Sequence, residues 1–443
     1  MRYELGALTM LKIYNSLTNQ VETFKPNQAN SVNMYVCGPT VYDDIHIGNG
    51  RPVVFFDVLK RYLSFRGFKV TYATNITDVD DRIIAKAINT NQTEKDIAKK
   101  FSEAFFDVVK NTGSEIPNLT PYATHYLTEM VTYIQKLIDT DYAYVKPSGV
   151  YFRVSKVNDY GMLSNQKIDE LRKGVRIDLE EDKEDTIDFA LWKFTKEGIT
   201  YDAPWGMGRP GWHTECAVMN DELFGDQLDI HGGGFDLKFP HHENEIAQSQ
   251  AHSHHHLANY WMHVGRLDMG SEKMSKSLGN VIKVKDLLAS YDAGSYRFML
   301  LAHHYRNPIH FSDELMTQYQ KTYDKISYTI NRLSFYFSAE ETKTDEKDQA
   351  LLDAFIKLMD DDFKTPAVVT LLDEAVKTLN KDKNQPLLNS VLTILSVLGI
   401  EPKVNAFTNE DLKTYHAWKQ ARDNKNYQLA DSLRQNLVEK GWI

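Results

Sequence analysis

The sequence predicts an α/β protein in which a parallel sheet is interrupted by an insertion and followed by a C-terminal bundle of α-helices. Within residues 34–74, two short apolar runs flank an apolar stretch of helical length, which is the pattern of a strand–helix–strand unit. Between residues 121 and 207 this pattern is replaced by short alternating runs and charged stretches. After about residue 320 the chain is helical in pattern and contains few glycines.

Length and composition indicate an ordered chain of several domains. The 443 residues are too many for one hydrophobic core, and 42% of them are apolar without any low-complexity tract. The sequence contains no run of about 18 apolar residues, so no membrane span is predicted. Residues 1–9 lack a signal pattern and are interpreted as an upstream start or a tag.

Cysteine content and charge restrict the compartment and the partners. Cys37 and Cys216 are the only cysteines, too few for a disulfide framework, so we expect a cytoplasmic protein. The net charge of −10 argues against a broadly basic nucleic-acid surface. It permits a local basic face on an acidic body.

The first elements are expected to form a βαβ unit. Residues 34–37 are an apolar run that ends in a Gly-Pro-Thr turn, which predicts a strand. Pro52 suits the first position of a helix over residues 53–65, and residues 70–74 are typical of the next strand. A βαβ unit of this kind begins a Rossmann-like domain, in which ligands bind at the carboxyl ends of the strands.

The middle of the chain is interpreted as an insertion into this domain. A helix is expected at residues 94–110, ahead of the insertion. Within the insertion, residues 142–145 and 149–154 predict a hairpin, and the charged stretch 178–188 predicts an exposed loop. The sheet is expected to resume at residues 228–231, just before three consecutive glycines.

The changes in pattern define the expected domains. Residues 340–348 are charged and are expected to be a solvated linker within the helical region. The expected parts are an N-terminal extension (1–9), the first half of the Rossmann-like domain (10–120), the connective insertion (121–207), the second half of the Rossmann-like domain (208–260), a lysine-loop region (261–325), a helical bundle (326–403) and a terminal helical region (404–443).

Two short motifs, far apart in the sequence, together indicate an ATP site. They are His-Ile-Gly-Asn at residues 46–49 and Lys-Met-Ser-Lys-Ser at residues 273–277. When a carboxylate is activated by ATP, negative charge builds up as pyrophosphate leaves. A helix N-terminus with a donor at His46 can meet that charge, and Lys273 and Lys276 can neutralise it. Each motif alone is also compatible with a surface turn or a solvated loop, so the inference depends on the pair.

A candidate metal site is formed by cysteine, histidine and carboxylate residues. Pro240 is expected to begin a helix, which would place His241 and Glu245 four residues apart on one face. With Cys37 and Cys216, they make a ligand set that suits Zn²⁺. Each cysteine could also be simply a small buried apolar residue, and the His-His-Glu segment could be a polar surface turn. The adjacent histidines at 254–256 would point in different directions on a helix, so we interpret them as a surface loop.

Several longer motifs carry a specific resemblance. As a set they resemble the cysteinyl-tRNA synthetases, class I aminoacyl-tRNA synthetases, from about residue 10 to the end of the chain. The resemblance implies the family's Rossmann-like nucleotide-binding catalytic domain with its connective insertion, followed by a C-terminal α-helical bundle. The first motif ends in Asn49, where the family most often has histidine. The motifs are MYVCGPTVYD (34–43), NITDVDD (75–81), GRPGWHTEC (208–216), DIHGGGFDL (229–237), PHHENE (240–245) and NYWMH (259–263).

The resemblance implies roles for individual residues around the substrates. It implies a single zinc ion on Cys37, Cys216, His241 and Glu245, to which the thiolate of the substrate cysteine also binds. The family's cysteine site falls on Cys37, Thr77, Trp212, Asp236 and His241, with Asp236 meeting the ammonium group and Trp212 closing over the side chain. The ATP site, with Mg²⁺, falls on His46, Gly48, Asn49, Gly233, Lys273 and Lys276.

The C-terminal region is expected to bind tRNA. Basic residues outnumber acidic ones in 417–434, although an ordinary amphipathic helix is an equally simple interpretation. By resemblance, Arg422, Tyr427 and Asp431 lie where the family reads the anticodon. The family usually continues past this point with a further short segment, so we expect one anticodon contact to be missing. The expected partners are a cysteine-specific tRNA, ATP and L-cysteine, and the protein is expected to act as a monomer.

The resemblance predicts a cysteine–tRNA ligase that first makes cysteinyl adenylate and pyrophosphate. Because thiolate binds zinc far better than a hydroxyl does, the insertion at 121–207 is expected to lack editing activity. One rival is a ligase that joins activated cysteine to an amino sugar, which lacks the helical end. Another is a catalytically silent tRNA- or zinc-binding relative.

Overall fold

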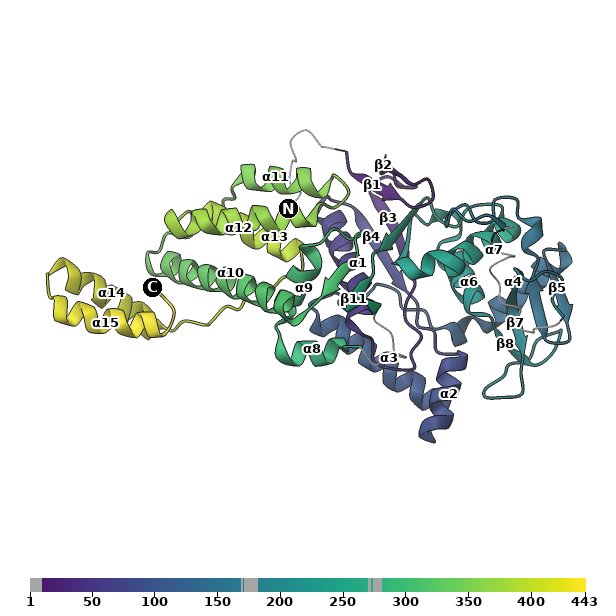
Figure 1. Cartoon of the computed structure of the whole chain (residues 1–443). Coiled ribbons are helices and arrows are strands. Elements are labelled where there is room, and N and C mark those ends of the chain that lie inside the picture. The colour runs from purple at the N-terminus through teal and green to yellow at the C-terminus, as the bar shows by residue number, and fades with distance from the viewer. Residues whose placement is uncertain (1–9, 169, 171–181, 270–271, 274–280) are drawn as a thin grey trace. The chain divides into compact units, whose positions relative to one another are not determined.

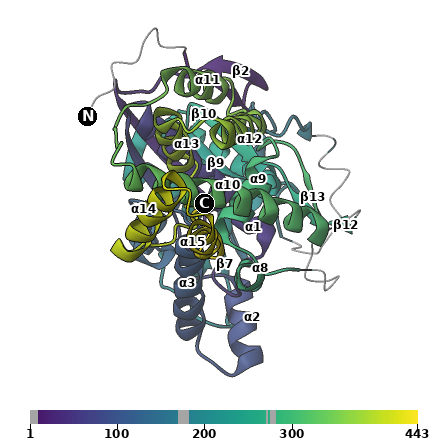
Figure 2. The same ribbon diagram turned by 90° about the vertical axis from the view of Figure 1, so that its left-hand side faces the viewer.

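The chain divides into two compact units. The computed structural model describes residues 10–168, 170, 182–269, 272–273 and 281–443 (Figures 1 and 2). The first unit is built mainly from residues 12–287 with 305–310, and the second from residues 288–304 and 311–443. The first contains the mixed α/β part and the second is helical, which confirms the predicted fold class.

A parallel four-stranded sheet forms the centre of the first unit. Its strand order is β10-β9-β3-β4, and every neighbouring pair is parallel. Their carboxyl ends therefore meet at one edge, which carries Cys37, Asn75 and Gly234. The strands are β3 (Ser31–Val36), β4 (Lys69–Thr74), β9 (Ile230–Gly234) and β10 (Tyr260–Val264).

Helix α1 (Ile47–Phe65) connects β3 to β4. It begins earlier than predicted, so Pro52 lies inside the helix rather than at its first position. The reason is the cap: Nδ1 of His46 accepts hydrogen bonds from the backbone N–H groups of Gly48 (3.1 Å) and Asn49 (3.2 Å). The buried guanidinium of Arg51 then anchors the helix by donating to the carbonyls of Gly265 and Asn307, each at 2.7 Å.

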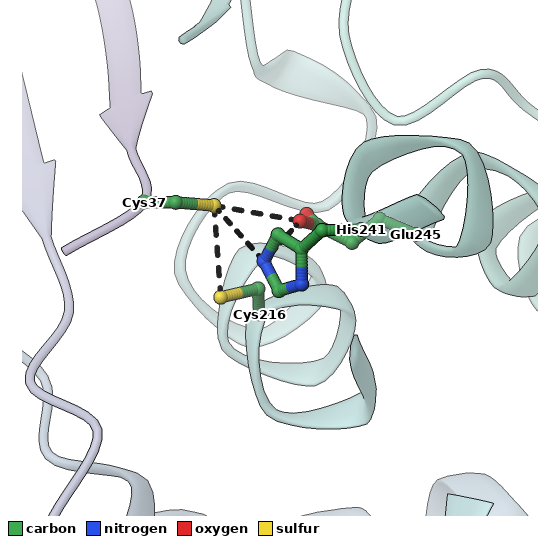
Figure 3. Close-up of side chains that lie close together, drawn as sticks. All are labelled: Cys37, Cys216, His241 and Glu245. Atoms are coloured by element: carbon green, nitrogen blue, oxygen red, sulfur yellow. Dashed lines mark hydrogen bonds and ion pairs between the residues drawn. The ribbon is translucent and has the colours of Figure 1, made fainter. Parts of the chain in front are cut away.

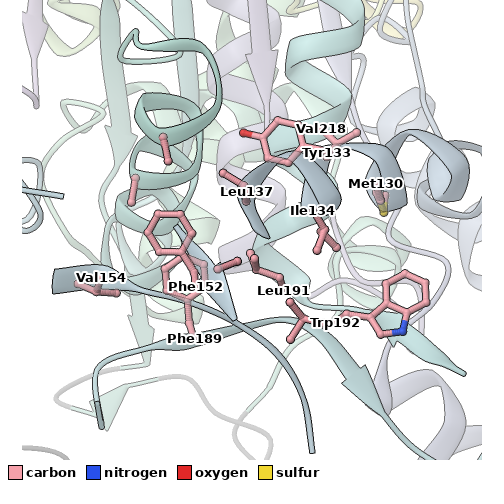
Figure 4. Close-up of a cluster of buried hydrophobic side chains, with 14 of the residues drawn as sticks. Met130, Tyr133, Ile134, Leu137, Phe152, Val154, Phe189, Leu191, Trp192 and Val218 are labelled. Atoms are coloured by element: carbon pink, nitrogen blue, oxygen red, sulfur yellow. The ribbon is translucent and has the colours of Figure 1, made fainter. Parts of the chain in front are cut away.

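The insertion forms an antiparallel sheet of its own, in the order β5-β6-β7-β8. The predicted hairpin is confirmed as β5 (Ala143–Lys146) and β6 (Gly149–Phe152), which continue into β7 (Phe189–Phe194) and β8 (Gly208–Pro210). Figure 4 shows the apolar side chains of this sheet packed against α4 (Leu127–Asp139) and Val218 of α6 (Trp212–Phe224). The insertion is thereby attached to the helix that also carries Cys216.

One residue of the predicted exposed loop at 178–188 is buried. Asp188 is only 2% exposed, because its carboxylate accepts hydrogen bonds from the Tyr144 hydroxyl (2.6 Å) and the Val154 N–H (2.9 Å). Residues 178–181 lie outside the described residues. Asp188 is therefore a buried hydrogen-bond acceptor that holds the hairpin of β5 and β6 through Tyr144 and Val154.

The remaining elements of the first unit frame the sheet. Strand β13 ends one residue beyond this unit, and α8 lies where the chain passes to the second unit. The elements are β1 (Lys12–Asn15), β2 (Gln20–Thr23), α2 (Asp81–Thr90), α3 (Glu94–Asn111), α7 (Glu243–Ser253), β11 (Leu267–Met269), β12 (Glu272–Lys273), α8 (Val284–Ser290) and β13 (Ile309–Phe311).

The second unit is a set of helices, as predicted. Buried Arg297 of α9 donates from Nε to the carbonyl of Leu398 (2.9 Å) and so joins two of its segments. Within the described ranges no helix is both long and apolar enough to cross a bilayer. The helices are α9 (Ala293–Leu301), α10 (Asp313–Ala339), α11 (Gln349–Met359), α12 (Thr365–Lys381), α13 (Gln385–Val397), α14 (Asn409–Asp423) and α15 (Tyr427–Glu439).

Helices α14 and α15 lie side by side (Figure 2), and α14 begins at a capping box. Thr408 accepts from the Asp411 N–H (3.2 Å), and the Asp411 carboxylate accepts from the Thr408 N–H (2.8 Å) and from Lys440 Nζ (2.7 Å). The hydrogen bond from Lys440, with those from Thr408, lowers the pKa of Asp411 to about 2. The same carboxylate therefore caps one helix and holds the end of the other.

We expect Thr408→Ala to loosen the α14–α15 pair, because the helix loses its cap acceptor. The expected loss is about 0.5–2 kcal/mol, read as faster amide hydrogen exchange in residues 409–439. Thr414→Ala is the matched control, since Thr414 lies inside α14 and bonds only its own helix. Equal protection in the two variants would contradict the capping role.

Candidate functional site

Four ionisable side chains from distant parts of the sequence meet at the carboxyl edge of the sheet (Figure 3). Cys37 Sγ lies 3.7 Å from Cys216 Sγ, 3.4 Å from His241 Nε2 and 3.4 Å from Glu245 Oε1. His241 Nε2 and Glu245 Oε1 are 3.0 Å apart. The four ligand atoms all lie within 4.8 Å of one another.

The end of a strand and two helices position these side chains. Cys37 follows the last residue of β3, and Cys216 lies in α6. The prediction that Pro240 begins the helix of His241 and Glu245 is confirmed: within Lys238–His242 only Phe239 has non-helical backbone angles, and the helical residues after it continue directly into α7. His241 and Glu245 therefore lie four residues apart on one helix, and their side chains meet across one turn.

The donor set fits a transition-metal ion. It offers two sulfur atoms, one imidazole nitrogen and one carboxylate oxygen, a combination that Zn²⁺ and similar ions prefer. Burial would raise the pKa of Cys216, but its contacts with Cys37 and His241 lower it to about 6. Burial would lower the pKa of His241, but Glu245 and Cys216 raise it to about 10. Burial and the neighbouring Cys216 and Glu245 raise the pKa of Cys37 well above its usual range, so the charges of the cluster are a Cys216 thiolate and a Glu245 carboxylate beside a protonated His241.

Two further histidines, which the sequence analysis missed as site residues, orient these donors. His213 Nδ1 lies 2.9 Å from Nδ1 of His241, so the ring nitrogen of His241 that faces away from Cys37 is engaged. His231 Nε2 lies 2.7 Å from Glu245 Oε2 and holds the carboxylate oxygen that does not contact His241. Partners of this kind fix the tautomer and orientation of metal ligands. His213 lies in the motif 208–216 and His231 in the motif 229–237. The spacing of residues along the sequence could not show that their side chains reach His241 and Glu245.

A buried chain of hydrogen bonds connects the segments of the two cysteines. The N–H of Gly38, next to Cys37, donates to Asn75 Oδ1 (2.7 Å), and Asn75 Nδ2 donates to Thr77 Oγ1 (3.1 Å). The Thr77 hydroxyl donates to Glu215 Oε1 (2.6 Å), next to Cys216. Burial raises the pKa of Glu215 well above its usual range, and the nearby Cys216 adds to the shift. We call these three hydrogen bonds, from Gly38 through Asn75 and Thr77 to Glu215, the strap, because they connect the segments that carry Cys37 and Cys216. Glu215 is a site residue that the sequence analysis missed.

A cavity of about 210 Å³ opens beside the four donors. The Trp212 ring stacks on the His241 ring, with centroids 4.4 Å apart. Arg82 also lines the cavity, with its guanidinium 5.5 Å from the centroid of the Trp212 ring and 3.1 Å from the Asp80 carboxylate. Residues of this cavity that the sequence analysis named are Cys37, Gly48, Asn49, Trp212 and Asp236.

The glycines of the site allow close approach of neighbouring groups. A Cβ on Gly48 would lie 3.0 Å from the His46 ring, and one on Gly233 would lie 2.9 Å from Leu237 and 3.0 Å from His242. His46 uses Nδ1 as the acceptor of its helix cap, so in the neutral ring the proton is on Nε2. The first turn of α1 therefore presents an N–H donor from His46 together with a helix N-terminus.

The second half of the ATP motif pair is described only at its start. Lys273 ends β12, which pairs with β11, whereas Lys276 lies outside the described residues. In the segment that follows, the Ile282 carbonyl accepts from the Ile47 N–H (2.9 Å), and Lys283 Nζ lies 2.9 Å from Asp43. The chain just beyond the lysine motif is thereby attached to the start of α1.

The three predicted anticodon residues lie in the second unit and are exposed. Arg422 is near the end of α14, and Tyr427 and Asp431 are in α15. The Arg422 guanidinium lies 5.0 Å from the Trp418 ring, which is half-buried. The adjacent basic residue Lys419 is paired with Glu340 at 2.8 Å, which reduces the predicted local excess of positive charge.

Comparisons with known proteins agree over most of the chain. A model of the "tRNA synthetases class I (C) catalytic domain" matches residues 23–321, and a DALR domain model matches residues 354–400. The chain is similar to the cysteine--tRNA ligase of Acholeplasma laidlawii, with 58% identity over 98% of this chain and all of that protein. It is 48% identical to the protein of the same name from Aster yellows witches'-broom phytoplasma, again over 98% of this chain and all of that one.

Solved structures support the fold independently. Methionyl-tRNA synthetase of Mycobacterium tuberculosis with methionyl-adenylate superposes with a TM-score of 0.63 at 13% identity, covering 83% of this chain and 89% of that one. A ternary complex of LeuRS, tRNA and LeuAMS from Agrobacterium radiobacter superposes with a TM-score of 0.59 at 10% identity, covering 85% and 84%. At such low identities the likeness establishes the fold alone.

We expect Cys216→Ser to lose tightly bound metal, because a hydroxyl does not replace a thiolate ligand. Elemental analysis of the purified protein should show stoichiometric metal in the parent and little in the variant. His256→Asn, in the exposed histidine run, is the control and should keep its metal. Loss of metal from the control instead would place the ion on the histidine run.

Thr77→Val should destabilise the first unit, because it removes the hydroxyl without changing the shape. Asn75 and Glu215 would then each lose a buried partner, at a cost of about 1–3 kcal/mol. Urea unfolding monitored by tryptophan fluorescence measures the difference. Thr77→Ser keeps the hydroxyl and should recover most of the loss. If Thr77→Ser and Thr77→Val lose the same free energy of unfolding, the methyl group of Thr77 stabilises the protein and the hydroxyl does not.

Proposed function

The chain belongs to the class I tRNA synthetases (C), as its motifs predict, and we propose that it is a cysteine–tRNA ligase. The observation that carries this proposal is the buried cluster of two thiols, an imidazole and a carboxylate at the strand ends of that catalytic domain. Relatives named cysteine--tRNA ligase extend over 98% of the chain, which includes its helical unit. That extent supports tRNA as the acceptor rather than an amino sugar.

The reaction has two steps. The carboxylate of L-cysteine attacks the α-phosphate of ATP, which gives cysteinyl adenylate and releases pyrophosphate. A ribose hydroxyl at the 3′ end of tRNA then attacks the acyl carbon, and AMP leaves. The substrates are thus L-cysteine, ATP with Mg²⁺ and the cognate tRNA. The enzyme carries out this reaction in the cytoplasm as a monomer.

The metal is Zn²⁺, held by Cys37, Cys216, His241 and Glu245. When bound, it supplies a Lewis-acid position that takes a thiolate in preference to a hydroxyl. His213 and His231 support this selection because they engage the outer atoms of His241 and Glu245. With sulfur and oxygen separated in this way, the insertion at 121–207 needs no hydrolytic editing site.

The other cavity residues orient cysteine. The carboxylate of Asp236 binds the ammonium group, and the Trp212 ring covers the side chain. Thr77 reaches the substrate from the hydrogen-bonded strap. Since the strap holds the segments of both cysteines, it also limits how far the two sulfurs can separate.

The start of α1 serves ATP. His46 donates from Nε2, and the helix N-terminus adds its partial positive charge. Lys273 and Lys276 neutralise the departing pyrophosphate. Gly48, Asn49 and Gly233 complete the nucleotide site, the two glycines by leaving space near the backbone. In the second unit, Arg422, Tyr427 and Asp431 contact the anticodon.

The test is exchange of labelled pyrophosphate into ATP. We expect exchange that depends on cysteine, with serine disfavoured by about 10⁴–10⁵ in kcat/KM, the range of sites that recognise a polar group directly. Charging of tRNA with labelled cysteine should follow. Cys216→Ser is the matched control and should lose cysteine-dependent exchange. Exchange that serine supports as well as cysteine would contradict the proposal.

A further inference from the structure

The cavity beside the four metal-ligating candidates has one basic residue in its wall. Glu115 and Asp236 contribute carboxylates, and among the described residues that line the cavity Arg82 alone has a basic side chain. The proposed reaction brings the carboxylate of an amino acid into this space. A carboxylate loses hydration when it enters such a cavity and needs a cation or hydrogen-bond donors in return. Arg82 can supply both.

Local contacts hold the guanidinium of Arg82 at the cavity wall. Arg82 is the second residue of α2, and Asp80 is the N-cap of that helix. The Asp80 carboxylate accepts hydrogen bonds from the backbone N–H of Arg82 (2.8 Å) and from its Nε (3.1 Å). The guanidinium carbon lies 5.5 Å from the ring centroid of Tyr42 and 5.5 Å from that of Trp212, within the range of cation–π contacts. The guanidinium is therefore oriented without a substrate.

Most of the hydrogen-bonding capacity of this guanidinium is unused. The contacts with Asp80 engage only Nε and the backbone, and within the described ranges neither Nη1 nor Nη2 of Arg82 has a protein partner. The side chain is 47% exposed, so these N–H groups are accessible to a ligand. A planar pair of N–H groups matches the two oxygen atoms of a carboxylate.

Arg82 is separated from the metal-ligating candidates by one aromatic ring. The Trp212 ring stacks on His241, with centroids 4.4 Å apart, and the guanidinium lies over the Trp212 ring. In the proposed function the thiolate of cysteine lies at the four donors beneath Trp212, and Asp236 takes the ammonium group. The carboxylate is then the one polar group of cysteine to which no residue has been assigned.

We propose that Arg82 is a substrate-binding residue whose two Nη groups hold the carboxylate of cysteine. Cysteine would then be held at three points, by its sulfur, its ammonium group and its carboxylate. Because Asp80 fixes Nε, the carboxylate is kept in one orientation while it attacks the α-phosphate of ATP. The inference rests on the proposed function, since it takes cysteine as the small substrate of this cavity.

Substitution of Arg82 tests this role in the pyrophosphate exchange assay. Arg82→Gln keeps a long polar side chain but loses the guanidinium, so the KM for cysteine should rise about 10- to 100-fold, the range of a hydrogen bond to a charged group. The KM for ATP and the metal content should stay at the parent values. Arg82→Lys keeps the charge without the planar pair of donors and should recover part of the cysteine affinity.

Lys86→Gln is the matched control. It removes one positive charge from the same helix, at a side chain that lies over the Phe101 ring and does not line the cavity. Exchange by this variant should equal that of the parent protein. A loss in Lys86→Gln as large as that in Arg82→Gln would mean that the overall charge of α2 matters and would overturn the proposal.

Cysteamine distinguishes contact with the carboxylate from support of the cavity wall. This molecule has the thiol and the ammonium group of cysteine but no carboxylate. As a competitive inhibitor of exchange by the metal-loaded protein, it should bind the parent and both Arg82 variants equally, whereas cysteine binds Arg82→Gln more weakly. An equal loss for cysteamine and cysteine would mean that Arg82 only holds Trp212 in place, which would overturn the proposal.

Other results would assign Arg82 to a different anion and would also overturn the proposal. A higher KM for ATP with an unchanged KM for cysteine would indicate a phosphate contact. Normal exchange with impaired charging would indicate a contact with tRNA. If Arg82→Gln fails to fold, Arg82→Lys decides the matter, because its KM for cysteine should rise by a smaller factor while the binding of cysteamine stays unchanged.

The same assay keeps this proposal distinct from the proposed function. If the parent protein shows no cysteine-dependent exchange, the proposed function fails. If the parent exchanges with cysteine and Arg82→Gln keeps the parent KM for cysteine, only the role of Arg82 fails.

Discussion

The burial of negative donors at one point constrains the whole first unit. Cys37 comes from a strand end, Cys216 from one helix, and His241 and Glu245 from successive turns of a second helical segment. Thiolate and carboxylate groups are costly to remove from water unless a positive charge compensates them. The proton on His241 supplies that charge, since the pKa of His241 rises to about 10 through Glu245 although burial opposes it, and a metal ion on the four donors would supply it as well. The strand and helices must therefore keep fixed distances.

The surrounding polar groups convert this constraint into a rigid site. His213 and His231 take the outer atoms of His241 and Glu245, and the strap through Thr77 connects the segments of the two cysteines. The proposed discrimination between sulfur and oxygen would depend on such rigidity, because a site that could relax around a hydroxyl would lose its preference. The strap also accounts for the buried carboxyl of Glu215, which accepts the Thr77 hydroxyl next to Cys216.

The carboxyl edge of the parallel sheet brings the metal-ligating candidates close to the start of α1. β3 lies between β9 and β4, so Cys37 is flanked by the ends of both neighbouring strands. The start of α1 lies at the same edge, where the imidazole of His46 both caps the helix and keeps a proton on Nε2. Gly48 and Asn49 from this helix start line the same cavity as Cys37.

The sequence alone determined the fold class, the family and the identity of the four metal-ligating candidates, because these depend on local patterns and short motifs. The βαβ unit, the hairpin of the insertion and the helical end all follow from periodicity and turn residues. Only the tertiary structure decided the start of α1, which His46 rather than Pro52 sets. It also brought Cys37 to within 3.7 Å of Cys216 and 3.4 Å of His241, which lie far away in the sequence. The partners of the metal-ligating candidates required coordinates as well, because hydrogen bonds between segments far apart in the chain leave no periodic signal in the sequence.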